Sequence, residues 1–426
     1  MSLIQEKSVH DHAAVRNGEP PAAPIGAGRR NPSTLLSLLT AAGGPRYAAA
    51  LAVDAVGGGM LRPFLLLYGV GVLHQHAGAV GLALSAGMVV GLLVVPLTGR
   101  WIDSGARTLP AAVTLVLRAA GALTLLAADG LPLFTVAAVL FGVGSQSWPT
   151  THAAVVSTLT EGRLRDAALA AGKSVRNAGL GAGALLATVA VAGGTGAIRL
   201  LAGVTGVACL VAAALVGSLR VRAPHKVHRV SPQERHEPLR RINLLSLANL
   251  PYAFCFDVLE VALPALLVLH LHTSAAWSSG VFVGNTVLVI ALQLAIVLWL
   301  AKRSRRAVLA AAGAALSVSY LGFWAAGSLG GTSGAVGIAA VAVLYTLGEI
   351  LYTGSGTALV TASAPPHLLG RALARWELSS GVGRAAAPAA LTALLAAGPG
   401  LLWVCLAATT AVGALAVLRL APAESE

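Results

Sequence analysis

The chain has 426 residues, of which 56% are hydrophobic and only 11% are charged, and its formal net charge is +13. Soluble domains carry about 25% charged residues, so a water-soluble fold could not hide this much apolar surface and still coat itself with charge. The basic excess does not indicate a nucleic-acid partner, because the basic residues lie in short segments between apolar runs. The composition therefore excludes a soluble domain and predicts that the lipid bilayer is the main solvent.

In chain order, residues 1–45 are polar and rich in Pro, Gly and Ala, which predicts a disordered cytoplasmic tail. A membrane-spanning helix needs about 20 mostly apolar residues. This rule predicts twelve spans, at 46–72, 78–98, 110–128, 132–157, 167–191, 198–217, 243–270, 277–300, 307–327, 335–359, 373–396 and 400–419. We expect six-helix bundles at 46–217 and 243–419, a basic cytoplasmic linker at 218–242 and a cytoplasmic tail at 420–426. The predicted fold class is an all-α membrane protein with twelve transmembrane helices.

The loops between these spans test the count independently. The loops predicted outside, near 73–77, 129–131, 192–197, 271–276, 328–334 and 397–399, contain no Lys or Arg. Every segment predicted inside is basic, with Arg46, Arg100, Arg107, Arg163, Arg165, Arg220 through Arg241, Lys302, Arg303, Arg305, Arg306, Arg371 and Arg419. This alternation satisfies the positive-inside rule at each turn. It predicts a multi-pass protein of the cytoplasmic membrane with both termini in the cytoplasm.

The two predicted halves resemble each other. Val72-Leu-His-Gln-His76 after the first span matches Val268-Leu-His-Leu-His272 after the seventh, at an offset of 196 residues. Matches around Gly144 and Gly348 give an offset of 204, and matches around Gly179 and Gly381 give 202. Two similar six-helix halves are the architecture in which one bundle rocks against the other around a central site.

The loop after the second span reads Gly99-Arg-Trp-Ile-Asp103-Ser-Gly105-Ala-Arg107. It is similar to the signature of major facilitator superfamily transporters, although the second glycine comes one position early and Ser104 replaces the usual basic residue. The resemblance implies two rocking six-helix bundles, with spans 1, 4, 7 and 10 lining a central cavity. It also implies that Asp103 faces the start of the eleventh span and latches the halves in the outward-facing state.

A narrower resemblance covers the tenth and eleventh spans. Gly348-Glu349-Ile-Leu-Tyr352-Thr-Gly-Ser-Gly-Thr357, followed by Ala364-Pro365 and Gly370-Arg371, is similar to twelve-helix drug:proton antiporters. Two features of that branch are absent, an arginine in the fourth span and a Gly-Pro pair in the fifth. The resemblance implies proton-driven efflux of small lipophilic or cationic compounds.

Ionisable residues inside spans are costly and are therefore functional candidates. They are Asp54, Arg62, Arg118, Arg176, Asp257, Glu260, Glu349 and Arg384. We expect Asp54 and Glu349 first, and then Asp257, to carry protons or to bind a cationic substrate. Asp257 and Glu260 are spaced i, i+3 and share a helix face, so one of them is expected to hold a proton. The alternative for each acid is a structural pairing with an arginine.

Four further residues are candidates for lining the substrate path, namely Tyr345, Tyr352, Gln146 and Asn177. No nucleotide-binding loop, nucleophile or metal-ligand constellation appears, so we expect neither an enzyme nor a cofactor, and the energy source is expected to be the proton gradient. The sequence predicts a monomeric secondary transporter that exports a small molecule. The alternative within transport is an importer or uniporter of a sugar or an organic anion, which Arg62, Arg176 and Arg384 would bind. A transport-inactive membrane receptor or scaffold is a third reading.

Overall fold

The computed structural model describes residues 37–38, 40, 42–62, 65–191, 194–223, 232–300 and 303–421. The predicted disordered tail lies almost entirely outside these residues, as do most of the predicted C-terminal tail and the middle of the linker.

The N-terminal half consists of six spans, the first of which is interrupted. Its elements are α2 (Gly44–Leu61), α3 (Leu65–Leu67), the π-helical η2 (Tyr68–Val72), α4 (Ala77–Asp103), α5 (Thr108–Leu126), α6 (Leu131–Leu159), α7 (Gly162–Val191) and α8 (Thr195–Gly217). The interruption follows Arg62, whose backbone is still helical and which precedes Pro63 in the sequence, and a proline has no N–H to donate to the helix ladder.

The C-terminal half repeats this order. Its elements are α9 (Pro232–Ala253), α10 (Cys255–Asp257), η3 (Val258–Ala262), α11 (Leu263–Ala265), η4 (Leu266–His270), α12 (Ala275–Leu300), α13 (Arg305–Ser328), α14 (Gly331–Ser363), η5 (Pro366–Leu368), α15 (Leu369–Ala397) and α16 (Pro399–Leu420). The seventh span, α9 to η4, widens into two π-helical turns, and Pro264 between them has no N–H to donate to the helix ladder. Helix α9 begins at Pro232, so part of the predicted linker is helical.

The described residues contain ten single helices that are long and apolar enough to cross a membrane, and the interrupted first span adds an eleventh. Helix α7, with 30 residues, packs along α2 and completes twelve. The predicted fold class, an all-α membrane protein of two six-helix bundles, is confirmed.

The structure shows which residues of the two halves are equivalent, and we call this correspondence the repeat register. It differs in part from the offsets predicted from sequence. His74 and His272, 198 residues apart, both have left-handed backbones, with φ of 53° and 52°. Each follows a π-helical turn closed by the same hydrogen bond, from Leu73 N–H to Tyr68 O and from Leu271 N–H to Leu266 O. The predicted offset of 196 is therefore wrong by two residues for the first spans.

For α6 and α14 the predicted offset of 204 is confirmed. Their capping residues Thr160 and Ala364 donate to Val156 O and Val360 O in the same way. For α7 and α15 the offset is also 204 rather than 202, because Gly179 and Gly383 make equivalent contacts. A Cβ at Gly179 would lie 2.4 Å from Cβ of Ala55, and one at Gly383 would lie 2.6 Å from Cβ of Ala253.

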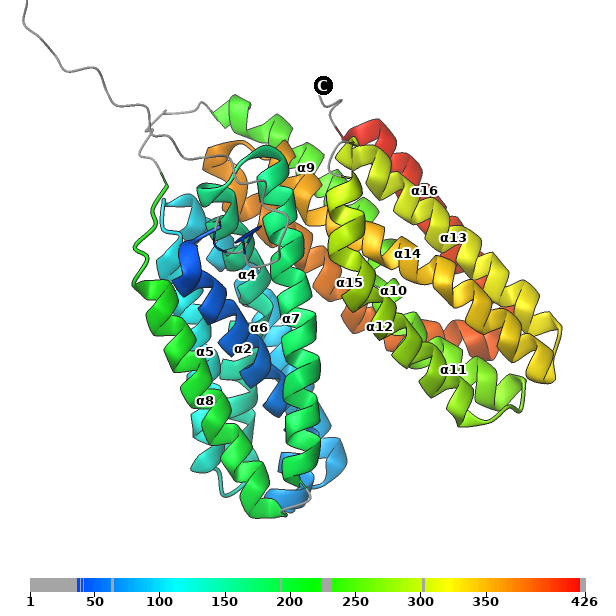
Figure 1. Cartoon of the computed structure of the whole chain (residues 1–426), viewed down its shortest axis with the longest axis horizontal. Helices are drawn as coiled ribbons and strands as arrows, with labels where there is room; N and C mark the ends of the chain where they lie inside the picture. The colour runs from blue at the N-terminus through cyan, green and yellow to red at the C-terminus, as the bar shows by residue number, and fades with distance from the viewer. Residues whose placement is uncertain are drawn as a thin grey trace, which may run out of the picture.

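The two bundles meet at one end of the molecule. In Figure 1 they lie side by side near α9 and diverge toward the other end, where α11 and the start of α8 lie. The meeting end carries Arg100, Arg163 and Arg303, and we call it the basic end. The sequence predicts that it faces the cytoplasm. Most of the apolar core lies inside each bundle, whereas one small cluster at the basic end joins Ile102 and Ala154 to Leu373 across the halves.

Candidate transport site between the two halves

Asp103, the last residue of α4, joins the halves at the basic end. Its Oδ1 accepts a 2.7 Å hydrogen bond from the backbone N–H of Gly370, and its Oδ2 lies 3.1 Å from Nε of Arg371. Gly370 is the second residue of α15, so the carboxylate meets a helix N-terminus, whose unpaired N–H groups favour negative charge. This is the position that the family resemblance implies for Asp103.

Two glycines allow α4 and α15 to approach this closely. A Cβ at Gly99 would lie 2.6 Å from Gly370 O, and a Cβ at Gly370 would lie 2.2 Å from Gly99 O. Any side chain at either position would push the helices apart at the basic end.

The loop after Asp103 is anchored to its own half. Gly105 has φ +97°, which L side chains rarely adopt, and its carbonyl accepts a 2.9 Å hydrogen bond from Ala223 N–H. The guanidinium of Arg107 is buried and donates from Nε to the Thr158 hydroxyl at 2.8 Å and from its NH1 to Ile102 O. Arg107 thus shapes the loop that presents Asp103, and it does not cross to the C-terminal half.

A second contact across the halves joins Asp166 of α7 to Arg305 of α13, with 2.7 Å between Oδ2 and Nε. In the repeat register Asp166 corresponds to Gly370, and Arg305 corresponds to Arg107. Both contacts therefore join the start of one helix, α15 or α7, to the segment around the loop between the second and third spans of the opposite half, and together they close the basic end.

Asp54 lies inside the N-terminal bundle and pairs with Arg118 of α5. Both residues are 2% exposed, the NH1 group of Arg118 donates to Oδ1 of Asp54, and the guanidinium also lies 5.5 Å from the centroid of the Phe141 ring. The repeat register places Tyr252 and Leu316 at the equivalent positions of the other half. This arrangement favours the structural pairing that the sequence left open for Asp54.

The centre of the molecule brings cations from both halves to one aromatic ring. Nζ of Lys173, on α7, lies 5.3 Å from the centroid of Phe256, on α10, and Cζ of Arg384, on α15, lies 6.0 Å from it. Both geometries are within cation–π range. Among charged groups, Glu349 and Glu377 act most strongly on the Lys173 ammonium.

Glu349 of α14 lies in a hydrogen-bonded chain with α12. Its Oε2 accepts a 3.2 Å hydrogen bond from Nδ2 of Asn285, whose Oδ1 accepts a 2.6 Å hydrogen bond from the Thr346 hydroxyl. Glu349 is half-buried and makes no ion pair with the described residues. Of the acids predicted first, Glu349 therefore keeps a carboxylate that is free of arginine, whereas Asp54 does not.

The span middles of the two halves carry opposite charge. The N-terminal half has one acid and four bases, which are Asp54, Arg62, Arg118, Lys173 and Arg176, and the C-terminal half has four acids and one base, which are Asp257, Glu260, Glu349, Glu377 and Arg384. Because Asp54 is paired with Arg118, the remaining charges in the span middles of the N-terminal half are cations. Arg62 and Arg384 are exposed, and neither they nor Arg176 form an ion pair within the described part of the chain.

Asp257 and Glu260 lie where the seventh span turns from α10 into η3. Asp257 is half-buried, and its Oδ2 has no hydrogen-bond partner among the described residues, whereas Glu260 is exposed. The charges that act on Asp257 include those of Glu260 and Arg384. Asp257 is thus a buried acceptor without a donor.

The predicted lining residues fall into two groups. Tyr345 and Tyr352 lie in the C-terminal core, where their hydroxyls donate to Cys255 O and, at 2.8 Å, to Oδ1 of Asn249. These two tyrosines pack and do not line a path between the halves. Gln146 is half-buried against Gly91 of α4, and Asn177 is half-buried on α7, one residue after Arg176.

The sequence analysis did not select Lys173 and Glu377, although both lie inside predicted spans. They lie on the parts of α7 and α15 that are nearer the basic end. A charged residue near the end of a span is usually taken to flank the membrane and not to lie inside it. The signal that identifies them is the repeat, because they are 204 residues apart and therefore equivalent.

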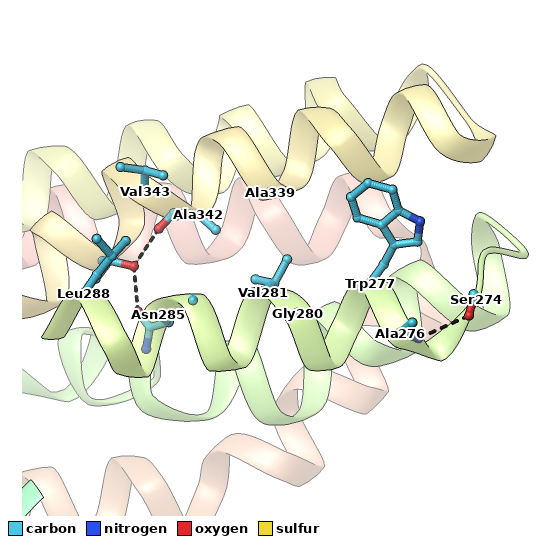
Figure 2. Close-up of a pocket in the computed structure, with 12 residues that line it drawn as sticks. Ser274, Ala276, Trp277, Gly280, Val281, Asn285, Leu288, Ala339, Ala342 and Val343 are labelled. Carbon is cyan, nitrogen blue, oxygen red and sulfur yellow. Dashed lines mark hydrogen bonds between the residues drawn. The ribbon is translucent and has the colours of Figure 1, made fainter. Parts of the chain in front are cut away.

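A cavity of about 390 Å³ lies between α12 and α14 (Figure 2). Trp277 lies at one end of it and Asn285 at the other, and Val281, Ala339 and Ala342 form apolar walls between them. The described residues contain no group of three His, Cys, Asp or Glu side chains that could hold a metal ion.

Two six-helix halves that meet at one end around a charged interior are an architecture of membrane transporters. A family model described as Major Facilitator Superfamily matches residues 47–247. The match covers most of the N-terminal half of the chain, and together with the fold it indicates a transporter rather than an enzyme. No curated protein sequence matches it.

Solved structures of transporters share the fold. A bacterial homologue of the iron transporter ferroportin, in the outward-facing state with soaked iron, is 13% identical with a TM-score of 0.73, over 88% of this chain and 98% of that one. The human organic anion transporter MFSD10 (TETRAN) is 15% identical with a TM-score of 0.68, over 89% and 98%. The E. coli fucose:proton symporter FucP is 14% identical with a TM-score of 0.66, over 89% and 98%.

Proposed function

We propose that this protein exchanges protons for small organic cations and exports them across the cytoplasmic membrane. The observation that carries the proposal is the acidic middle of the C-terminal half, where Glu349 and Asp257 form no ion pair with any described residue. An organic cation and a proton compete for such carboxylates, because each neutralises a charge that the bilayer interior disfavours.

The cations of the N-terminal half couple the charge state of these acids to the conformation of the protein. The basic end is closed by Asp103 and Asp166 and is predicted from sequence to face the cytoplasm, so the proposed state is outward-facing. Lys173 and Arg176 attract Glu349 and Glu377 when those acids are charged, and this attraction draws the halves together at their centre. A bound proton or cation weakens that attraction, so occupancy of the acids biases which end of the molecule is open.

The test is ethidium flux in proteoliposomes with and without an imposed pH gradient. We expect the gradient to drive ethidium uptake by the wild type, and Glu349→Gln to abolish the driven component. Asp129→Asn, in an exposed loop, is the matched control and retains flux. Driven flux that is unchanged in Glu349→Gln would reject the proposed role of this acid.

The second candidate is transport of an organic anion, which the convergence of Arg62, Arg176 and Arg384 favours. Counterflow of a small aromatic carboxylate such as benzoate separates the two candidates. Benzoate counterflow that is lost in Arg384→Gln, together with no ethidium flux in the wild type, would establish the anion as substrate.

A further inference from the structure

The repeat shows how the cavity between α12 and α14 arises. In the N-terminal half the equivalent helices, α4 and α6, touch backbone to backbone. A Cβ at Gly87 would lie 2.4 Å from Ala138 O, and a Cβ at Gly142 would lie 2.2 Å from Gly87 O. That packing leaves no space between the two helices.

The C-terminal half has Asn285 and Thr346 at the positions equivalent to Gly87 and Gly142, by the offsets of 198 and 204. Their side chains hydrogen bond to each other at 2.6 Å and hold α12 away from α14. The cavity of about 390 Å³ opens at this point, and both residues line it. The cavity therefore lies where two polar residues stand in place of the two glycines that touch in the other half.

The chemistry of the cavity differs along its length (Figure 2). Its walls are aliphatic, Trp277 offers an aromatic face at one end, and the Asn285 amide at the other end leads directly to Glu349. A volume of this size lies in the range of small-ligand pockets, about 300–1,000 Å³. The apolar body of a ligand fits the walls. A positive charge is favoured at either end, by Glu349 through Asn285 at one and by the face of the indole ring at the other.

We propose that this cavity binds the organic cation, with its apolar body between α12 and α14 and its charged group at Asn285. The inference rests on the proposed function and locates its substrate. Asn285 donates to Glu349, so a cation that attracts the carboxylate or the amide oxygen disturbs the same chain of hydrogen bonds that a proton on Glu349 disturbs. Binding and protonation are coupled through one amide group.

Two glycines of α12 allow the cavity to be filled without disturbing the fold. Gly280 and Gly284 line it, and a Cβ at either position meets no atom within 4 Å. Gly284→Leu and Gly280→Leu therefore occupy the cavity and leave Asn285 and Glu349 unchanged. Gly81→Leu is the matched control, because Gly81 also has open space around its Cβ and lies on α4, outside the cavity.

The experiment measures ethidium binding to the purified full-length protein in nanodiscs by fluorescence enhancement, alongside the flux assay. We expect Gly284→Leu and Gly280→Leu to weaken binding at least tenfold, and Gly81→Leu to bind as the wild type does. Unchanged ethidium binding in both cavity variants would overturn the inference. If these variants lose co-purified lipid and still bind ethidium, the cavity is a lipid-binding site. That result would also overturn the inference.

The two proposals can fail separately. If the wild type transports ethidium and Gly284→Leu transports it equally well, the cavity assignment falls and the proposed function stands. If the wild type binds ethidium in a Gly284-dependent way without proton-driven flux, the cavity assignment stands and the proposed function falls.

Discussion

Lys173 and Glu377 occupy equivalent positions in the two halves, 204 residues apart, and carry opposite charges. Each acts on the other electrostatically from opposite halves of the molecule. They do not form an ion pair in this structure, where Lys173 lies over the Phe256 ring instead. Direct pairing therefore requires Lys173 to leave this ring.

Removing either charge should favour the open arrangement of the centre. We expect Lys173→Met and Glu377→Gln each to raise the maleimide accessibility of a cysteine placed at Asn177, several-fold in rate, because the attraction that closes the centre is lost. The charge-reversed double variant, Lys173→Glu with Glu377→Lys, should return the rate toward that of the parent. A double variant no closer to the parent than either single variant would show that these residues do not act on each other.

The ion pair between Asp54 and Arg118 is expected to act on stability. Breaking one partner of a buried pair costs about 3–5 kcal/mol, because the other charge is left buried and uncompensated. Asp54→Asn should therefore lower the melting temperature in detergent strongly. Asp54→Tyr with Arg118→Leu copies Tyr252 and Leu316, the equivalent residues of the other half. Its melting temperature tests whether an uncharged pair can replace the ion pair. Wild-type melting of Asp54→Asn would contradict the structural role.

Gly370 should control closure of the basic end. In Gly370→Ala the new Cβ would meet Gly99 O, so the two helices must separate and the closed state is penalised. Spin labels at the exposed positions Leu159 and Leu418, one in each half, should report a larger population of long distances. Gly78→Ala, at the other end of α4 with open space around its Cβ, is the control, and an equal distance distribution in both variants would contradict the prediction.

Gly105 should be sensitive to substitution for backbone reasons alone. An alanine at φ +97° costs about 1–2 kcal/mol, although its Cβ would meet no other atom. We expect Gly105→Ala to lower the melting temperature measurably, whereas Gly81→Ala, in a helix with open space, should not. If the two variants melt alike, the loop relaxes without cost and does not hold Asp103 in place.

The sequence by itself determined the twelve spans and the division into similar halves. These depend on local apolar runs, because each stretch of chain reports its own preference for the bilayer. The repeat was visible too, but two of its three offsets were wrong by two residues, since short motifs shift easily where no backbone geometry anchors them.

Only the tertiary structure decided which charges are neutralised and which remain available. Asp54 and Glu349 look alike in sequence, yet Asp54 meets Arg118 from another helix whereas Glu349 meets an amide. The cavity likewise depends on Asn285 and Thr346 facing each other across two helices where Gly87 and Gly142 touch in the other half. Such facts depend on the rotation and register of helices that are distant in the chain, and local hydrophobicity does not fix either of them.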